Sequence, residues 1–376
     1  MLEKGVQVQR NWTMEHLSVS HSSSDRALAR LCEKLADGSG VIEANNAWPS
    51  EQLKLCGQAG VYQWFLSGQW GGQEWEEQEL VRGYVRLSTA CLTTAFIITQ
   101  RTGACRRIEA CENRWLKSHL LPKLAGSESF STVGISHLTT SHRHLKRSVL
   151  CASETAKGFV LEGFSPWVTG GIHADHILVG ATLDDGRQIL IVVPTKLPGV
   201  NAEKPVPLLA VSASHTGKVT FESVEVGREW LVAGPVEDVM GQSSGAGTGG
   251  VSTSALALGL SDSAIQFIEK QSEKRQELLE VASQLRSEFD QLFTKLLAVA
   301  GGDPTHTLQE LRIRCNSLVL RATQASLMAA KGAGFVEGHP SGRWCREAMF
   351  FLVWSCPQSV AKANLCELAG IDEDEV

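Results

Sequence analysis

The sequence predicts an α+β protein in which a helical domain, a β domain and a second helical domain follow one another along the chain. Three observations support this prediction: apolar residues at helical spacing in the first third, short β-branched runs in the middle, and helical spacing again after a glycine-rich stretch. We expect the domains to span residues 1–129, 130–235 and 236–376. A chain of 376 residues is long enough for two or three packed domains.

The first helical domain is predicted from apolar residues that recur every three or four positions, as at Leu28, Leu31 and Leu35. This spacing brings them to one face of a helix. Glycines interrupt the pattern, notably the pair Gly71 and Gly72, and we interpret the interruptions as loops between helices.

The middle domain is predicted from short runs rich in β-branched residues, at 158–162, 177–181, 189–194 and 219–226. Between the second and third runs, Asp184-Asp185-Gly186 has the composition of a hairpin turn, because glycine accepts positive φ and aspartate tolerates turns. We therefore expect the middle domain to be antiparallel.

The last domain is predicted from an apolar stripe at helical spacing, formed by Leu278, Val281, Leu285, Phe289, Leu292 and Leu296. Two more helices are expected, at about 307–331 and 344–368, with glycines and Pro340 between them. Together these segments predict a helical bundle. The acidic tail 372–376 is expected to be a solvated end.

Composition excludes several classes of function. The 35 Lys and Arg against 41 Asp and Glu give a net charge of −6, which provides no global field for a nucleic-acid backbone. No window reaches the roughly 18 uninterrupted apolar residues of a membrane span, so we expect a cytoplasmic, unanchored protein. The ten cysteines form no C-x-x-C pair, and no acid or cysteine completes a ligand set around His142 and His144 or around His173 and His176. We predict no metal.

Four segments carry the motifs of one family. The first reads L-L-P-K-L-A-G at 120–126, followed by V-G-I-S at 133–136, and the second reads G-F-S-P-W-V-T-G-G at 163–171. The third reads V-T-F-E-S-V-E-V at 219–226, and the last is Gly332-Ala333-Gly334-Phe335 followed by Pro340, Arg343, Arg346, Glu347 and Ala348. These segments resemble those of the acyl-CoA dehydrogenase family of flavoproteins, over nearly the whole chain.

The resemblance implies that family's fold, with a barrel-like antiparallel β domain between an N-terminal helical domain and a C-terminal four-helix bundle. It also implies FAD as the cofactor. Trp167 would cover the isoalloxazine ring, the Thr169 hydroxyl would bond near its N5 atom, and two glycines would approach the pyrophosphate of a neighbouring subunit. The residues expected to bind the cofactor are Gly134, Ile135, Ser136, Trp167, Thr169, Arg275, Gly332 and Gly334.

The residues alone leave other interpretations open. Trp167 could fill the core beside a strand, and Gly332 with Gly334 could simply stop and restart a helix. The basic run 141–147 could meet a phosphate of CoA or of a carrier protein, or it could form a solvated loop.

Two departures from the family pattern concern the cofactor. The Phe-Gly pair that follows the motif arginine, here Arg275, is replaced by Leu278-Leu279. The glutamine that precedes the glycine loop is replaced by Met328, which lacks the hydrogen-bonding capacity of an amide. We therefore expect weaker FAD contacts between subunits.

The family's catalytic carboxylate is missing. In the family it removes the α-proton of an acyl thioester while the β-hydrogen leaves as a hydride to the flavin. Its usual position falls at Ser355, and a serine without a neighbouring base cannot take a proton near neutral pH. Some branches place it near Gly249, but no acid occurs between residues 241 and 260. Candidates for a relocated base are Glu347, Glu337 and His339.

We therefore predict an FAD-dependent oxidoreductase of the acyl-CoA dehydrogenase type, acting on the CH–CH group of an acyl thioester of CoA or acyl carrier protein. The resemblance implies a homodimer or homotetramer, with an electron-transfer flavoprotein or a flavin reductase as partner. The missing carboxylate favours one alternative, a monooxygenase in which reduced flavin reacts with oxygen. The altered residues Leu279 and Met328 favour another, a non-catalytic flavin-binding homologue that acts through a partner.

Overall fold

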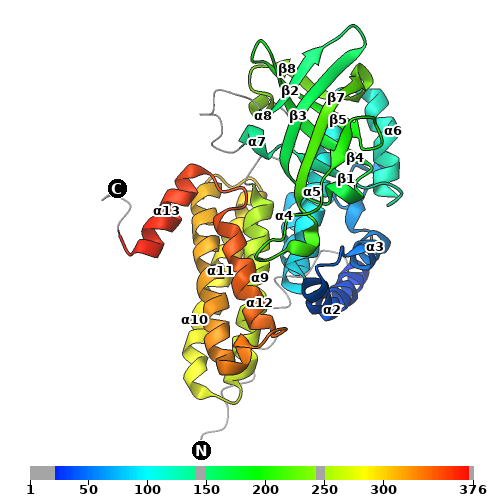
Figure 1. Ribbon diagram of the computed structural model, residues 1–376. Helices are drawn as coiled ribbons and strands as arrows, with labels where there is room; N and C mark the ends of the chain where they lie inside the picture. Colours follow the sequence, from blue (N-terminus) through cyan, green and yellow to red (C-terminus); the bar gives the residue numbers. More distant parts are fainter. Residues whose placement is uncertain (1–21, 140–148, 243–249, 372–376) are drawn as a thin grey trace, which may run out of the picture.

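The computed structural model describes residues 22–139, 149–242 and 250–371, and it has the predicted order of helices, sheet and helices (Figure 1). The N-terminal helices are α2 (Ser22–Asn45), α3 (Ser50–Gln58), α4 (Glu77–Ala90), α5 (Leu92–Ala110) and α6 (Arg114–Ala125). The main C-terminal helices are α9 (Val251–Ser272), α10 (Leu279–Ala300), α11 (Leu308–Ala330), α12 (Pro340–Met349) and α13 (Gln358–Ala369). In Figure 1, α4 and α5 lie between the sheet and the bundle formed by α9 to α12.

The middle of the chain forms one eight-stranded sheet in the order β6-β7-β3-β2-β4-β5-β8, with β1 paired to β4. Its pairs are antiparallel, except that β4 runs parallel to both β1 and β2. The predicted hairpin turn joins β4 to β5, and Gly186 there has a φ of +88°, which a glycine adopts without strain. The strands are β1 (Ser131–Gly134), β2 (Leu150–Glu154), β3 (Gly158–Val168), β4 (His176–Leu183), β5 (Gln188–Pro194), β6 (Val200–Ala202), β7 (Gly217–Gly227) and β8 (Leu231–Val236).

Both faces of the central strands are buried, which explains their uninterrupted apolar sequences. Because successive side chains of a strand point to opposite faces, Ile177 and Val179 join one core while Leu178 joins another. The first core lies within the sheet, and the second packs the sheet against α5 and α6. A strand buried on both sides reads as a continuous apolar run.

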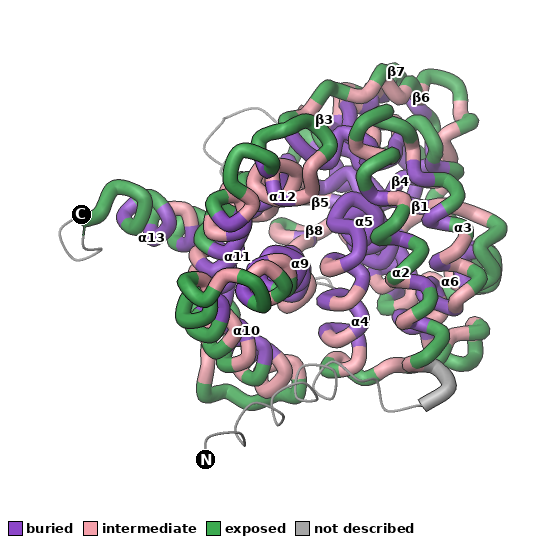
Figure 2. The backbone as a smooth tube through the Cα atoms, turned by 90° about the horizontal axis from the view of Figure 1, so that it is seen from below, coloured by how far each residue is buried: buried purple, intermediate pink, exposed green. Residues whose placement is uncertain are grey.

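The N-terminal and C-terminal helices share a single hydrophobic core, although the β domain separates them in the sequence. This core joins residues such as Leu87 of α4, Ile97 of α5, Leu256 of α9 and Leu318 of α11. Figure 2 shows buried residues along α5 and α9, where the two groups of helices meet. The helical segments on either side of the sheet therefore pack as one body.

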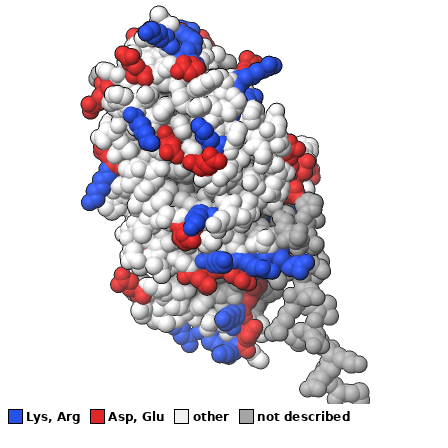
Figure 3. Space-filling model, turned by 90° about the vertical axis from the view of Figure 1, so that its right-hand side faces the viewer, with Lys and Arg blue, Asp and Glu red and all other residues white. Residues whose placement is uncertain are grey.

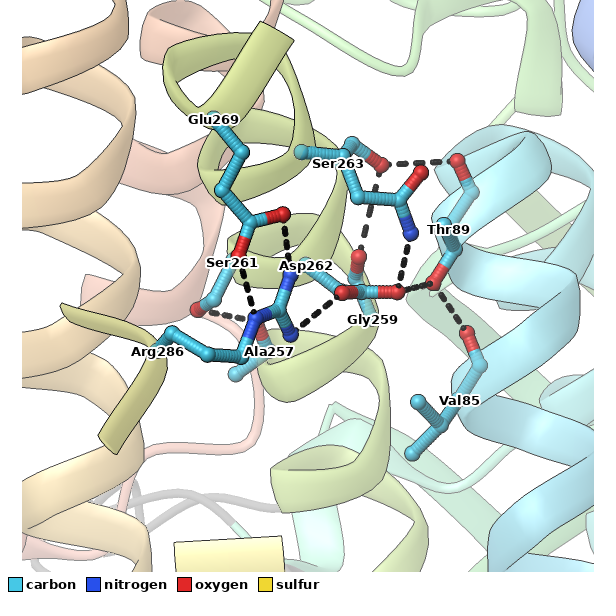
Figure 4. Close-up of polar contacts among 10 residues, drawn as sticks. Val85, Thr89, Ala257, Gly259, Ser261, Asp262, Ser263, Glu269 and Arg286 are labelled. Carbon is cyan, nitrogen blue, oxygen red and sulfur yellow. Dashed lines mark hydrogen bonds and ion pairs between the residues drawn. The ribbon is translucent and has the colours of Figure 1, made fainter. Parts of the chain in front are cut away.

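A polar network ties α4, α9 and α10 together (Figure 4). The buried Asp262 accepts a hydrogen bond from Arg286 Nη1 at 2.8 Å and another from the Thr89 hydroxyl at 3.3 Å. Arg286 also donates through Nε to Glu269 at 2.8 Å. Burial alone would lower the pKa of Arg286, but Asp262 and Glu269 raise it above its ordinary value.

Two expectations for the C-terminal part were wrong. The segment 344–368 is not one helix: α12 ends at Met349, a short 3-10 turn (Phe350–Leu352) follows, and α13 begins at Gln358. Ser355 has a φ of +47°, outside the right-handed helical region, and Pro357 has no N–H to continue the helix. Val281 is 43% exposed and does not belong to the core-facing stripe of α10.

Charges of both signs are intermixed on the face shown in Figure 3, without a large area of one sign. Among the described helices, none combines the length and the apolar character that crossing a bilayer requires. The acidic tail 372–376 lies outside the described residues.

Candidate functional site

A cavity of about 700 Å³ lies where the N-terminal helices, the sheet and the bundle meet. Its volume is within the range of small-molecule sites, roughly 300–1,000 Å³. We call it the central cavity. Its lining residues fall within 96–107 on α5, 133–139 at and after the end of β1, 167–169 at the end of β3, 208–216, 250–253 at the start of α9, and 346–355.

Trp167 lies at the mouth of the central cavity, and a local irregularity of β3 places it there. Between the pairs Ser165–Val219 and Val168–Gly217, β3 contains one more residue than β7, so the strand bulges. Pro166 lies in this bulge, where a missing N–H breaks no ladder hydrogen bond. The Trp167 side chain is 54% exposed, so it is not a core residue, and its ring borders the cavity.

Thr169 belongs to a short chain of buried hydroxyl groups on the same wall. The hydroxyls of Thr169 and Thr216 share a hydrogen bond of 3.0 Å, and those of Thr216 and Ser214 share one of 2.9 Å. Thr169 and Thr216 both line the cavity. The backbone at this end of β3 is fixed as well, because the Gly170 N–H donates to the Ser214 carbonyl at 3.0 Å.

The segment after β1 forms the neighbouring wall. Ile135 and Ser136 line the central cavity, whereas Gly134 does not. A side chain at Gly134 would place its Cβ 2.8 Å from the Ser165 hydroxyl oxygen, so glycine allows β1 to approach β3 closely. The predicted residues Ser136 of the first motif segment and Trp167 and Thr169 of the second are therefore brought together around one cavity.

Ser355 also lines the central cavity, at the turn between α12 and α13. The turn is held by two buried side chains of α11. Arg312 donates from Nη2 to the carbonyl of Trp354 at 3.0 Å, and Asn316 donates from Nδ2 to that of Phe351 at 3.1 Å. These bonds stabilise the left-handed backbone of Ser355, which carries a strain of order 1–3 kcal/mol in a non-glycine residue.

The charged residues on the cavity wall, within the described part of the chain, are Arg107 and Arg346, and no Asp or Glu lines it. The segments 140–148 and 243–249, which lie outside the described residues, contain no Asp or Glu either. Arg346 Nη2 lies 3.4 Å from Glu43 Oε1. A carboxylate positioned to take a proton from a ligand in this cavity is thus missing from its described wall.

None of the three candidates for a relocated base lines the central cavity. Glu347 is buried on α12, with its Oε1 3.6 Å from Arg343 Nε. Burial raises the pKa of Glu347 to about 7, against the lowering effect of Arg343. His339 instead caps α12, where its Nδ1 accepts from the Ser341 N–H at 3.2 Å, and Glu337 is exposed.

Arg275, Gly332 and Gly334 lie at the opposite end of the bundle from the central cavity. The start of α9 lines the cavity, and Arg275 follows the end of this 22-residue helix, about 33 Å away at 1.5 Å per residue. Arg275 Nη1 donates to the Ala329 carbonyl at 2.8 Å, next to the glycine loop. Within one chain, these residues and Trp167 therefore border separate sites.

α5 contributes to the cavity although none of the motifs lies on it. Residues of one face of α5 line the cavity, and only Arg107 among them is charged; they are Phe96, Thr99, Gln100, Gly103 and Arg107. Their spacing of three, one, three and four residues is helical, so the sequence does indicate that they share one helix face. It does not indicate that this face borders a cavity, because a mixed polar and apolar stripe is typical of any half-exposed helix face.

The basic run, the cysteines and the histidine pairs named above add no further group to the central cavity within the described residues. The basic run 141–147 and Gly249 lie outside the described residues. The cysteines are all free thiols, with Cys151 exposed and several others, such as Cys56, buried. Across residues 22–139, 149–242 and 250–371, no group of three or more His, Cys, Asp or Glu side chains is arranged to hold a metal ion.

Comparison with known proteins gives a consistent result. No protein-family model matches the chain. A probable acyl-CoA dehydrogenase of Bacillus subtilis, YngJ, is 21% identical over 231 residues, which are 60% of each chain; the match thus spans less than two thirds of that relative.

Among solved structures, butyryl-CoA dehydrogenase from Megasphaera elsdenii matches with a TM-score of 0.80 at 16% identity, over 94% of this chain and 99% of that one. A dibenzothiophene monooxygenase from Paenibacillus sp. A11-2 matches with a TM-score of 0.77 at 15% identity, over 93% and 98%. The chain therefore has the fold of these enzymes, and over part of its length its sequence is similar to that of a probable acyl-CoA dehydrogenase.

Proposed function

We propose that this chain is an FAD-dependent oxidoreductase that oxidises an acyl thioester of CoA or of an acyl carrier protein. The observation that carries the proposal is the meeting of Trp167, Thr169 and Ser136 around a cavity of about 700 Å³. Trp167 and Thr169 come from the end of β3 and Ser136 from the segment after β1. The family resemblance assigns Trp167 and Thr169 to the flavin ring and Ser136 to the cofactor.

The residues of the central cavity fit a flat, partly polar ring. The half-exposed indole of Trp167 offers an apolar surface for stacking, and the Thr169 hydroxyl offers a hydrogen-bonding group on the adjoining wall. When bound, a flavin supplies an acceptor for a hydride. Trp167 would hold the ring in place, and Thr169 would orient it.

The far wall of the cavity suits an apolar chain. Phe96, Phe350 and Trp354 line it, with ring centroids of Phe96 and Trp354 5.0 Å apart and those of Phe350 and Trp354 stacked at 5.2 Å. Such a surface holds an acyl group through apolar contact and excludes water from it. Ser355, beside this wall, can donate a hydrogen bond, but its hydroxyl cannot act as the base on its own.

A second function is a flavin-dependent monooxygenase. The specific observation that favours it is the lack of Asp and Glu on the described cavity wall, because a reaction of reduced flavin with oxygen does not need a carboxylate at the position of Ser355. The dibenzothiophene monooxygenase that shares the fold supports this candidate.

The other end of the bundle supports an oligomer. Three apolar side chains beside the glycine loop are strongly exposed, Met328 at 80%, Phe335 at 88% and Val336 at 64%. We propose that this end contacts a neighbouring subunit and that Arg275, Gly332 and Gly334 meet its cofactor. Light scattering of the purified chain should give the mass of a dimer or tetramer, whereas a monomer with fully bound FAD would contradict this part of the proposal.

One sequence of measurements separates the functions. An absorbance spectrum of the purified protein, before and after FAD is added, should show bound flavin, and a series of acyl-CoA thioesters should then bleach it without oxygen. Bound flavin that no thioester bleaches, together with oxygen consumption when reduced flavin is supplied, would support the monooxygenase instead. A protein that takes up no flavin would contradict both and leave a non-catalytic role.

A further inference from the structure

Three buried hydroxyl groups form a chain on one wall of the central cavity. Thr216 Oγ1 lies in the middle, 2.9 Å from Ser214 Oγ and 3.0 Å from Thr169 Oγ1. Ser214 is 0% exposed, Thr216 6% and Thr169 2%. Thr169 and Thr216 line the cavity, whereas Ser214 does not. The chain therefore runs from the interior of the protein to the cavity wall.

The backbone that carries this chain is held in a strained conformation. Ser214 lies in a short 3-10 turn between two left-handed residues that are not glycine, Val211 at a φ of +54° and His215 at +46°. Each such residue carries a strain of order 1–3 kcal/mol and persists where its surroundings hold it. Here His215 Nδ1 lies 2.8 Å from His173 Nε2, and His215 Nε2 lies 2.9 Å from the Asn46 carbonyl oxygen. The position of the Ser214 hydroxyl is thus fixed from outside the turn.

The chain has one more proton than it has hydrogen bonds. A hydroxyl donates one hydrogen bond and accepts up to two, so three hydroxyls joined by two bonds leave one proton for an acceptor outside the chain. Among the described residues, Thr216 is the only hydrogen-bond partner of Ser214 Oγ. A buried donor without an acceptor costs about 1–3 kcal/mol. Ser214 therefore donates to Thr216, and the remaining proton leaves at the cavity end.

The proton that leaves the chain belongs to Thr169. Hydrogen bonds in a chain polarise one another, so a hydroxyl that accepts a bond becomes a stronger donor. Thr216 accepts from Ser214 and therefore donates to Thr169. The Thr169 hydroxyl has accepted this bond and has no other described partner, so its own proton is available to a ligand in the cavity.

We propose that Ser214 and Thr216 are positioning residues that fix the Thr169 hydroxyl as a hydrogen-bond donor, so that this wall selects a ligand atom that accepts a hydrogen bond. The inference rests on the proposed function in taking a flavin ring as the ligand. Ring nitrogen N5 of a flavin is an acceptor when the flavin is oxidised and carries a hydrogen when it is reduced. The chain should therefore favour the oxidised cofactor over the reduced one.

The first experiment tests the donor. It compares FAD with 5-deaza-FAD, in which a C–H group replaces N5 and removes the acceptor. Calorimetry gives the dissociation constants for the full chain and for Thr169→Val. We expect the wild-type protein to bind FAD about three- to ten-fold more tightly than 5-deaza-FAD, the usual worth of one neutral hydrogen bond, and Thr169→Val to lose this preference.

The second experiment tests the positioning role of Thr216. In Thr216→Val the Thr169 hydroxyl is free either to donate or to accept, so the bias toward oxidised flavin should disappear. The ratio of the affinities for oxidised and reduced FAD should fall about three- to ten-fold, which raises the two-electron reduction potential of the bound flavin by about 15–30 mV. Anaerobic equilibration with a reference dye measures this potential.

Two control variants separate the direction of the chain from a general effect on structure. Thr216→Ser keeps the hydroxyl and should keep the wild-type potential. Thr323→Val removes another buried hydroxyl, which donates to the Val319 carbonyl at 2.8 Å and does not line the cavity, and it should change neither the potential nor the preference for FAD. An equal rise of the potential in Thr323→Val would overturn the inference.

The outcomes distinguish this inference from the proposed function. If the chain binds FAD but binds 5-deaza-FAD equally well, or if Thr169→Val keeps the preference, the inference is wrong and the flavin site stands. An unchanged potential in Thr216→Val would likewise contradict the inference alone. A chain that binds neither flavin would contradict the proposed function, and the inference with it.

Discussion

Two arginines of the helical body differ in what surrounds them. At the α9–α10 interface, Arg286 contacts both Asp262 and Glu269 through hydrogen bonds of 2.8 Å (Figure 4). On α11, Arg312 instead donates to the backbone carbonyls of Phe351 at 3.3 Å and Trp354 at 3.0 Å, in the turn that lines the central cavity. The first charge is matched inside the fold. The second holds the backbone of a turn beside the ligand site, so the first should govern stability alone and the second should affect both stability and binding.

Removing Arg286 should produce the largest loss of stability. In Arg286→Met, Asp262 stays buried without its cation, and breaking one half of a buried ion pair lowers the free energy of unfolding by about 3–5 kcal/mol. Urea denaturation measures this change. Flavin and acyl-CoA affinities of the folded variant should stay at wild-type values, and a loss below about 1 kcal/mol would mean that the network does little for stability.

Glu347 should make stability depend on pH. Its pKa is raised by burial from 4.5 to about 7, so between these values the folded protein binds more protons than the unfolded chain. The free energy of unfolding therefore falls as the pH rises from about 5 to 7, by about 1–3 kcal/mol from this group. Glu347→Gln should remove that part of the decrease. If the free energy of unfolding changed with pH in the same way in both proteins, the raised pKa of Glu347 would be contradicted.

Arg312 should affect both stability and binding, because its bonds go to backbone carbonyls of the turn at Ser355. Arg312→Met should lower the free energy of unfolding by about 1–3 kcal/mol, since the carbonyl of Trp354 loses a charged donor. The released turn lines the central cavity, so acyl-CoA affinity should fall as well. Thermal denaturation measures the loss of stability, and calorimetry measures the acyl-CoA affinity. A loss of stability with unchanged affinity would show that the turn at Ser355 does not contribute to ligand binding.

The order of helices, sheet and helices could be predicted from the sequence, because apolar periodicity differs between helix and strand. The motif around Trp167 and Thr169 could be predicted as well, and the structure brings both to one cavity with Ser355. The break between α12 and α13 was missed, although Pro357 signalled it, because the apolar period of residues 344–368 outweighed one proline.

The rest of the candidate site depends on tertiary packing that no local pattern encodes. Arg107 is one of two adjacent arginines on α5, and only the position of β1 beside that helix decides which of them borders the cavity. Arg275 and Gly332 match cofactor motifs, yet the length of α9 separates them from Trp167. A motif gives residue types and spacing along the chain, and it leaves the distance between sites undetermined.

The most direct test of the account is the affinity of FAD for the wild-type chain and for Trp167→Leu, measured by flavin fluorescence. Trp115→Leu is the matched control, because Trp115 is 43% exposed, stacks on His119 and does not line the central cavity. We expect Trp167→Leu to weaken FAD binding by about three- to ten-fold, as loss of one aromatic stacking contact does, with no change in Trp115→Leu. Equal FAD affinity in all three proteins would show that the central cavity is not the flavin site.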